Sequence, residues 1–499
     1  MTSRVVRLSV VLLIAAGRAP AQIIPIHTAP IVPADQFDIF PSYTLAMGEV
    51  SIAVADTLHD PFVNPAKGAR VRAARFFGSP TFYSVSHDAG AGRTLPLGLL
   101  SAAGSWYGGF ALALQQLDAS HTSRSFLAPP PVAFAAAGPL GATDVSPEPE
   151  THGNALAFAM IGKTLPGSGL SLGGSVRWAK LRAVDGVDLL YPGSTRVHQY
   201  GETMDARLGV LKDWAGDQSL EAVILHERFR MTHDVTFFDT FWDPGAQQFF
   251  QRARLEHNGD FTRRWGAQVK YERPLTTSGW RVGWLATANR TSQPSTPNTD
   301  VLNIPQDPGR ATAYELGVGV SRAYGAALFG MDVVYQPIWS TTWAVAGTPT
   351  ATAAGGTIPI GGRTVDNAFH FSNALFRMGV SRDVARSLTK TAGVQLGLLV
   401  RSVHYSLAQQ DHIEAATRRL EESWLEWTPT WGLSLRFPEL ELRYRGRVSH
   451  GTDRMIATPN QFIGIADLRP IGFFPPPSPA PTLDGVHVVT HQISISLPL

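Results

Sequence analysis

The sequence from Trp431 to Ser449, WGLSLRFPELELRYRGRVS, alternates between two kinds of side chain. Leucines and aromatic residues occupy one parity, while glycine, serine and charged residues occupy the other. Successive side chains of a β-strand point to opposite faces, so this stretch predicts two strands with one apolar and one charged face. Pro438 and Glu439, between the two halves, leave room only for a tight turn. The charged face is too rich in arginine for a protein core, and we expect the apolar face to contact lipid.

The same alternation recurs along the chain as far as Ile493 to Leu499, and the alternating segments number about 16. Short turns of glycine, proline or aspartate alternate with long connections. The long ones lie near 117–153, 183–200, 231–260, 291–311, 339–368, 407–423 and 450–486. Short turns on one rim and long loops on the other are typical of transmembrane β-barrels. The sequence therefore predicts an all-β fold, a transmembrane antiparallel β-barrel over residues 70–499 with long extracellular loops.

The N-terminus has the features of a secretory signal peptide. Arg4 and Arg7 precede the apolar run Leu8 to Gly17, and Ala19-Pro20-Ala21 supplies a small-x-small cleavage site. We therefore interpret residues 1–21 as a signal peptide. No later stretch approaches the roughly 18–20 apolar residues of a membrane-spanning helix. An exported chain of this kind is either secreted or a barrel, and the alternation favours a barrel in the outer membrane of a Gram-negative cell.

Composition argues against several other classes of protein. The chain has 499 residues and a net charge of +2, which gives no indication of a nucleic-acid partner. It has no cysteine, as in an exported protein that does not depend on disulfides. The fifteen histidines show no metal-ligand spacing, and no phosphate loop or dinucleotide fingerprint is present. We therefore expect no metal and no cofactor.

Residues Leu45 to Ala69, LAMGEVSIAVADTLHDPFVNPAKGA, combine a small-residue stretch, an Ala-x-Ala-Asp motif and Asn-Pro-Ala just before the first strand. This combination resembles the outer-membrane transporter family typified by the long-chain fatty-acid channel FadL, and the related PorV-type barrels. The resemblance implies a plug over residues 22–69, folded into the barrel, and a usual strand number of 14, so that a split strand near the N-terminus could explain our count of 16. One departure is Lys67-Gly68, where the family usually continues with a small or apolar pair. The carried-over plug residues are Gly48, Asp56, Asn64, Pro65 and Ala66, with Ala53 and Ala55 in the same pattern.

Strand parity also divides residues between lipid and lumen. The apolar parity, for example Leu156, Phe158 and Met160, is expected to face outward. The charged parity is expected to line the lumen, as pairs that satisfy one another or as an arginine ladder that binds an anionic group such as a carboxylate. These lumen candidates are Glu315, Arg436, Glu441, Arg443, Arg445 and Arg447.

Aromatic residues form two groups. Tryptophans such as Trp106, Trp178, Trp284 and Trp339 lie near strand ends, where rings favour the lipid–water interface. A second group lies in the 231–260 connection, for which a short hairpin is an alternative to a loop, and is expected either to capture an apolar substrate or to cap the barrel mouth. It consists of Phe237, Phe238, Phe241, Trp242, Phe249 and Phe250.

One catalytic-looking string, Gly169-Leu170-Ser171-Leu172-Gly173, lies inside a predicted strand without the helix that a nucleophile elbow requires, so we do not expect an enzyme. The prediction is a barrel in outer-membrane lipid that passively transports hydrophobic or amphipathic small molecules. The alternative is a PorV-like secretion-accessory or structural barrel that binds a protein partner through its extracellular loops. A general porin and an outer-membrane enzyme are weaker alternatives.

Overall fold

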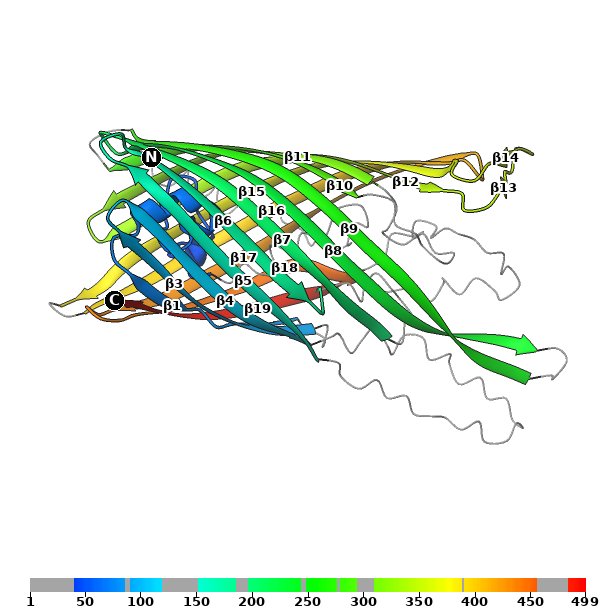
Figure 1. Cartoon of the computed structure of the whole chain (residues 1–499), viewed down its shortest axis with the longest axis horizontal. Helices are drawn as coiled ribbons and strands as arrows, with labels where there is room; N and C mark the ends of the chain where they lie inside the picture. The colour runs from blue at the N-terminus through cyan, green and yellow to red at the C-terminus, as the bar shows by residue number, and fades with distance from the viewer. Residues whose placement is uncertain are drawn as a thin grey trace, which may run out of the picture.

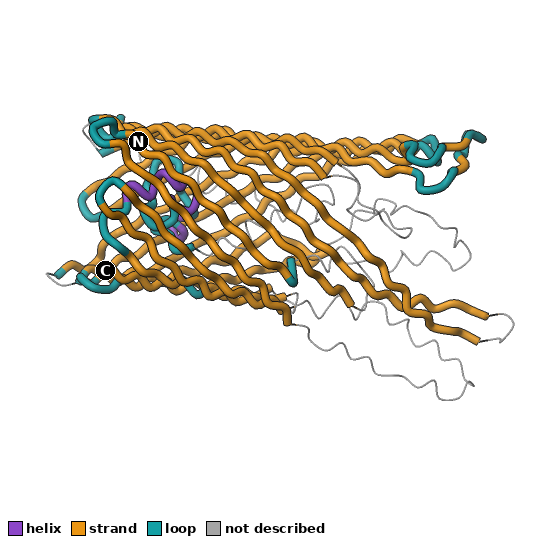
Figure 2. The backbone as a smooth tube through the Cα atoms, viewed as in Figure 1, coloured by secondary structure: helices purple, strands orange, loops and turns teal. Residues whose placement is uncertain are grey.

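The computed structural model describes residues 40–85, 90–118, 151–184, 196–243, 248–275, 279–293, 309–387, 390–455 and 483–499. In these residues nearly every segment is an antiparallel strand of one barrel wall (Figures 1 and 2). The short helical turns are η1 (Leu45–Met47), α3 (Asp60–Val63) and η2 (Pro65–Arg70). No helix among the described residues is long and apolar enough to span a membrane. The predicted signal peptide lies outside the described residues.

The strands follow one another around the wall in chain order. Their bounds are β1 Arg75–Gly78, β2 Thr81–Val85, β3 Gly90–Ala103, β4 Trp106–Asp118, β5 Thr151–Leu165, β6 Leu170–Leu181, β7 Arg196–Trp214, β8 Gln218–Asp243, β9 Gln248–Pro274, β10 Trp280–Gln293, β11 Gly309–Tyr324, β12 Ala327–Val345, β15 Arg363–Arg386, β16 Thr391–Asp411, β17 Ala416–Arg436, β18 Glu441–Met455 and β19 Leu483–Pro498, with a small external ribbon of β13 Thr350–Ala351 and β14 Thr357–Ile358.

The barrel closes through an interrupted strand. Both β1 and β2 pair with β19 on one side and with β3 on the other. The interruption falls at Ser79 and Pro80, and proline cannot donate a ladder hydrogen bond. The two pieces therefore count as one wall strand, and the described residues form a closed barrel of 16 strands. This confirms the predicted fold class and the count of 16. A split strand is present near the N-terminus, but it does not bring the count down to 14, because 16 strands remain when its two pieces are counted as one.

The two rims of the barrel differ in the length of their connections. Residues 104–105, 166–169, 215–217, 325–326 and 437–440 are tight turns that join strands at one end, the short-turn rim. At the opposite end, the long-loop rim, several predicted loops are strand. Residues 231–260 belong largely to the β8–β9 hairpin and 407–423 to the β16–β17 hairpin, because cross-strand pairing continues well beyond the membrane. The strands therefore project as ribbons at this end (Figure 1).

The outer face of the wall is apolar and exposed, as expected of a surface that contacts lipid. On the β17–β18 hairpin that opened the sequence analysis, Leu433 and Leu435 are exposed outward, while Gly432 faces the interior against Ala46. Large outward side chains recur around the barrel: Leu112, Leu208, Ile224, Leu316 and Leu396 are each more than half exposed. Trp106, Trp178, Trp284 and Trp339 are also exposed on this face, in keeping with an aromatic girdle.

The prediction for Leu156, Phe158 and Met160 is wrong. These side chains of β5 are buried inside the barrel, while Ala157, Ala159 and Ile161 take the outward positions. The alternation along β5 is as predicted, but the outward and inward faces are exchanged, because the larger apolar side chains point into the barrel rather than toward lipid. One sector of the barrel interior is consequently apolar.

Candidate functional site

Residues 40–71, hereafter the plug segment, lie inside the barrel close to the short-turn rim (Figures 1 and 2). The η1 turn packs against β15, β16, β17 and β18, and η2 packs against β5, β6 and β7. The segment therefore crosses the interior and contacts opposite parts of the wall. Residues 22–39 of the predicted plug lie outside the described residues, and the boundaries 22–69 stay a prediction.

Asp56 organises the plug segment from within. Its buried carboxylate accepts hydrogen bonds from the backbone N–H groups of Tyr43 (2.5 Å), Leu58 and His59 (3.1 Å each). It also accepts a hydrogen bond from the Ser42 hydroxyl. A carboxylate is suited to this position because it accepts several hydrogen bonds at once. Asp56 thus joins the start of the segment to the turn that precedes α3.

Asn64, Pro65 and Ala66 form the turn from α3 into η2. The Asn64 side chain accepts a hydrogen bond from Ala66 N–H at 3.0 Å, which caps η2, and its amide group donates to Val210 O on β7 at 3.3 Å. Pro65 occupies the first helical turn, where its missing N–H costs nothing. All three residues are buried, so this turn both ends one helix and attaches the segment to the wall.

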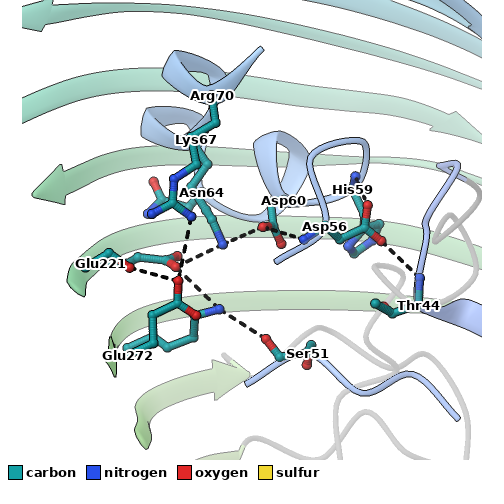
Figure 3. A network of polar contacts seen from close by, with 12 residues as sticks. Thr44, Ser51, Asp56, His59, Asp60, Asn64, Lys67, Arg70, Glu221 and Glu272 are labelled. Carbon is teal, nitrogen blue, oxygen red and sulfur yellow. Dashed lines mark hydrogen bonds and ion pairs between the residues drawn. The ribbon is translucent and has the colours of Figure 1, made fainter. Parts of the chain in front are cut away.

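Lys67 is the centre of a buried ionic network between plug segment and wall (Figure 3). Its ammonium lies 2.6 Å from Asp60 Oδ2 and 2.9 Å from Glu221 Oε1 on β8. Glu221 is also 3.4 Å from Lys270 of β9, whose ammonium donates to Ser51 O at 3.1 Å. Burial alone would lower the pKa of Lys67, but the carboxylates of Asp60 and Glu221 raise it above its ordinary value. Lys67 is therefore charged in its buried position.

Two arginines extend this contact. Arg70 lies 2.7 Å from Asp213 and 3.8 Å from Glu272. Arg207, an inward residue of β7, donates to Phe62 O at 3.2 Å and Val63 O at 3.1 Å, which are carbonyls at the end of α3. A guanidinium is favourable there because the C-terminal carbonyls of a helical turn carry partial negative charge.

The other half of the plug segment rests on glycines of the wall. A Cβ atom at Gly379 or Gly397 would lie less than 3.0 Å from the backbone of Met47 or Gly48. The Thr430 hydroxyl of β17 accepts a hydrogen bond from Gly48 N–H and donates one to Ala46 O, each at 2.9 Å. Other wall glycines in close contact with plug residues are Gly173, Gly209, Gly283, Gly319, Gly330 and Gly432. Small residues at these inward positions make room for the plug backbone.

Three of the charged lumen candidates, Glu441, Arg443 and Arg447, contact the plug segment. The Arg443 guanidinium lies 3.4 Å from the centre of the Tyr43 ring and pairs with Glu441, and Arg447 is 3.0 Å from Glu49 of the plug segment. Arg436 pairs with Asp383, Glu315 accepts a hydrogen bond from Gln336, and Arg445 is buried. The geometry favours mutual pairing over a free ladder, since carboxylates of the chain engage Arg436, Arg443 and Arg447.

Burial raises the pKa of Tyr43 above its ordinary value, while the charge of Arg443 opposes the shift. The Tyr43 hydroxyl accepts a hydrogen bond from Arg75 at 2.7 Å. Tyr43 is therefore held between two cations and the carboxylate of Glu441, to which its hydroxyl donates at 3.3 Å. This cluster fixes the start of the plug segment against the seam where the barrel closes.

The aromatic group of the 231–260 connection is not in an irregular loop. Phe237, Phe238, Phe241 and Trp242 lie on β8, and Phe249 and Phe250 lie on β9, with Phe241 opposite Phe250 and Trp242 opposite Phe249. The backbone therefore places these residues together at the tip of a projecting ribbon. Their role in substrate capture stays a prediction.

A cluster of inward apolar side chains continues from the plug segment along the wall. Phe62 stacks on Phe40 with ring centroids 3.8 Å apart, and it contacts Phe158 at 4.9 Å and Phe77 at 5.6 Å. From there the cluster follows β4 to β8 toward the long-loop rim. We call it the inner apolar cluster; it comprises Phe40, Phe62, Phe77, Leu100, Tyr107, Ala111, Ala113, Leu156, Phe158, Met160, Ala179, Leu181, Val184, Phe229, Met231 and Val235.

Sequence reasoning missed two parts of this site. The buried Lys67 network was not predicted, although Lys67 was the noted departure from the FadL pattern and Glu221 lies at an inward parity of its strand. The inner apolar cluster was missed because the apolar parity was assigned to lipid throughout. The wall glycines were assigned to the lumen, but alternation alone gives no reason why they are glycine.

No protein-family model and no curated protein matches the sequence. Solved structures with a similar overall shape include a Pseudomonas aeruginosa FadL homologue (TM-score 0.42, 11% identity, covering 92% of this chain and 98% of that one). They also include the Pseudomonas putida toluene transporter TodX (0.37, 12%, 91% and 97%) and a bacterial polysaccharide outer membrane secretin (0.38, 8%, 86% and 98%). At this level of similarity, neither the family nor the substrate of these proteins can be inferred for this chain.

Proposed function

We propose that this barrel passes hydrophobic or amphipathic small molecules inward across the outer membrane by diffusion, without an energy source. The observation that carries the proposal is the inner apolar cluster. Water-filled barrels are lined by polar side chains, whereas one sector of this interior is apolar from Phe62 to Val235. Each side chain of the cluster is at most 6% exposed, so a solute would bind by separating these side chains. An apolar solute gains free energy by leaving water for such an apolar environment.

The outer face of the barrel supports a location in the outer membrane. Leucines and isoleucines that are more than half exposed would be unfavourable in water but are stable against lipid. A closed barrel with short turns at one rim and long connections at the other is the arrangement found in outer membranes. With the predicted signal peptide, these features support the outer membrane as the site of action.

The route ends at the plug segment. Phe40 and Phe62 belong to the plug and to the inner apolar cluster at once, so a solute that moves along the cluster meets these stacked rings. Passage then requires the rings, and the segment that carries them, to move aside. The cluster would thus serve as both the binding surface and the seal.

Uptake of an apolar fluorescent probe into liposomes that contain the barrel tests the proposal. Phe158→Gln places an amide in the cluster and is expected to slow uptake several-fold, because a polar group without a partner is costly there. Phe110→Gln is the matched control, since Phe110 lies on the neighbouring strand β4 and is exposed outward. Equal uptake by both variants and the parent would contradict a role for the cluster.

Single-channel conductance in planar bilayers tests the seal. The full-length protein is expected to be closed, and a chain without residues 22–69 is expected to conduct, because the interior is then unobstructed. Steady conductance of the full-length protein would instead indicate a porin.

A second candidate function, partner binding by a PorV-like barrel, is supported by the ribbons at the long-loop rim. β8 and β9 have 26 and 27 residues, while a tilted membrane strand needs only about 9–11. Removal of the tip, residues 234–257, distinguishes the two functions. Loss of a stable surface partner with no apolar uptake by the parent would favour the partner-binding role.

A further inference from the structure

The outer face of β8 to β11 carries a patch of arginines. We call Arg228, Arg263, Arg290 and Arg310 the outer arginine patch; all four are exposed and lie at outward parity. Arg228 is directly opposite Arg263, Arg263 is opposite Ser292, and Ser292 is opposite Arg310, so three of the arginines follow one row across four strands. Arg290 lies in the adjacent row, opposite Trp265.

On the inner face of β8 and β9, the charged side chains are paired, unlike those of the outer arginine patch. Glu227 and Arg264 are the neighbours of Arg228 and Arg263 along the chain, point inward, and form an ion pair at 2.5 Å. On the outer face the directly opposed residues have the same charge, which is destabilising by itself. Within the described part of the chain, none of the four patch arginines has a carboxylate partner. Glu202, on the next outward row, lies opposite Arg230 and accepts a hydrogen bond from Trp178. The outer charges therefore lack an anion that the inner charges have.

The surroundings place the patch at the edge of the membrane. Toward the short-turn rim, the adjacent row contains His226 stacked on Trp265 (4.2 Å) and Trp339 stacked on His370 (5.1 Å). Exposed tryptophans of this kind mark the lipid–water interface. Below them the outward rows are apolar, with Ile224 opposite Ala267. A cationic patch thus follows directly on an aromatic row and an apolar band.

We propose that the outer arginine patch binds the phosphate groups of an anionic lipid in the leaflet at the long-loop rim. A guanidinium matches phosphate oxygens in a bidentate manner and stays charged. The apolar rows beneath accept the acyl chains, which favours a lipid over free phosphate as the occupant. The site is on the outside of the wall, so it does not depend on which solute the interior transports.

Native mass spectrometry of the full barrel in detergent, with a bisphosphorylated glucosamine lipid as probe, tests this site. Removing two of the charges in Arg228→Gln/Arg263→Gln should weaken binding about thirtyfold, at roughly a tenfold loss per 1.4 kcal/mol and about 1 kcal/mol for each basic residue near the surface. Arg228→Lys/Arg263→Lys keeps the charge but loses the bidentate geometry, so its binding should lie between those of the parent and the glutamine variant. Arg382→Gln/Lys390→Gln removes two exposed charges at the short-turn rim and should leave binding unchanged.

The heat-dependent shift in gel mobility shows whether each variant is folded. Equal binding by the parent and Arg228→Gln/Arg263→Gln would overturn the proposal, as would undiminished binding of the same lipid after its phosphates are removed. Complete displacement of the lipid by millimolar inorganic phosphate would overturn it in favour of a free-phosphate site. An equal loss of lipid binding in Arg382→Gln/Lys390→Gln would show that binding depends only on the net charge of the barrel, and this would also overturn the proposal.

Discussion

The two halves of the plug segment are held in the barrel by different physics. Residues 56–71 are fixed by buried charges, with Lys67 between Asp60 and Glu221. Residues 44–54 rest mainly on wall glycines, because the backbone at Met47 and Gly48 lies directly on Gly379 and Gly397. Their contacts with wall charges include the partly exposed Glu49–Arg447 pair and the hydrogen bonds that Ser51 and Ile52 donate to the buried Asp332. Breaking a buried ion pair leaves both charges without their partner, whereas these contacts leave fewer buried charges unpaired when they separate. The comparison predicts that residues 44–54 separate from the wall more readily.

Lys67→Met should have the largest effect. It removes the cation of the partly buried Asp60 and leaves the buried Glu221 with only Lys270 at 3.4 Å, which costs up to about 3–5 kcal/mol of docking free energy. Hydrogen exchange should therefore accelerate in residues 60–70 more than in residues 44–54. Adding Glu221→Gln to this variant should recover part of the loss. The control is Arg72→Met, an exposed cation just beyond the segment, and unchanged exchange in Lys67→Met would contradict the ionic half of the comparison.

Gly397→Ala tests the half that rests mainly on wall glycines. The new methyl group overlaps the backbone of Met47 and Gly48, and overpacking of this kind costs about 1–3 kcal/mol. Exchange should accelerate in residues 44–54 and stay slow in residues 60–70. Gly153→Ala is the matched control on a wall strand, because its Cβ would meet only Gln115 O at 3.9 Å. If both halves loosen together, the plug segment is one cooperative unit.

Thr430→Val tests how residues 44–54 are held with a smaller change. Valine keeps the shape of the side chain but loses the hydroxyl that bonds Gly48 N and Ala46 O at 2.9 Å each. The expected loss is about 1–2 kcal/mol, again seen as faster exchange at residues 46–48. Thr428→Val removes a hydroxyl whose partner, Ser449, belongs to the wall, and it should leave the plug segment unchanged. An equal response of the two variants would assign the effect to the barrel rather than to docking.

The sequence was sufficient for the barrel because strand parity and turn chemistry are local. The segment Trp431–Ser449 predicted its own hairpin, and Leu433 faces lipid as expected. Parity does not tell which face of a strand is inside when both the lipid and the barrel interior accept apolar side chains. For this reason Phe158 was expected to face lipid, whereas it lies inside the barrel. The length of hairpins that extend past the membrane, such as β8–β9, is not evident from the sequence, because their outer parts have no lipid-facing pattern; only a short hairpin within residues 231–260 was an alternative to a loop.

The plug interface was less accessible to sequence reasoning because its partners are far apart in the chain. Asp56 and Asn64 organise their own neighbourhoods, and such short-range roles follow from residue type and spacing. Lys67 and Glu221 meet only after β7 and β8 have closed part of the wall, and nothing near either residue indicates the other. The same holds for Met47 and Gly397, whose contact depends on where the segment crosses the lumen.

The smallest effect that separates the halves is a response to pH. The pKa of Lys67 is raised above its ordinary value, against burial, by Asp60 and Glu221, so the docked segment binds this proton more tightly than the released one. Its contribution is complete below the unfolded value of 10.5 and is lost as pH rises through the docked-state pKa. Closed-state conductance should therefore be constant from about pH 7 to about pH 9.5 and increase only at higher pH. Lys67→Met should lack this alkaline response. An increase below about pH 9 in the parent would assign the control of docking to a group other than Lys67.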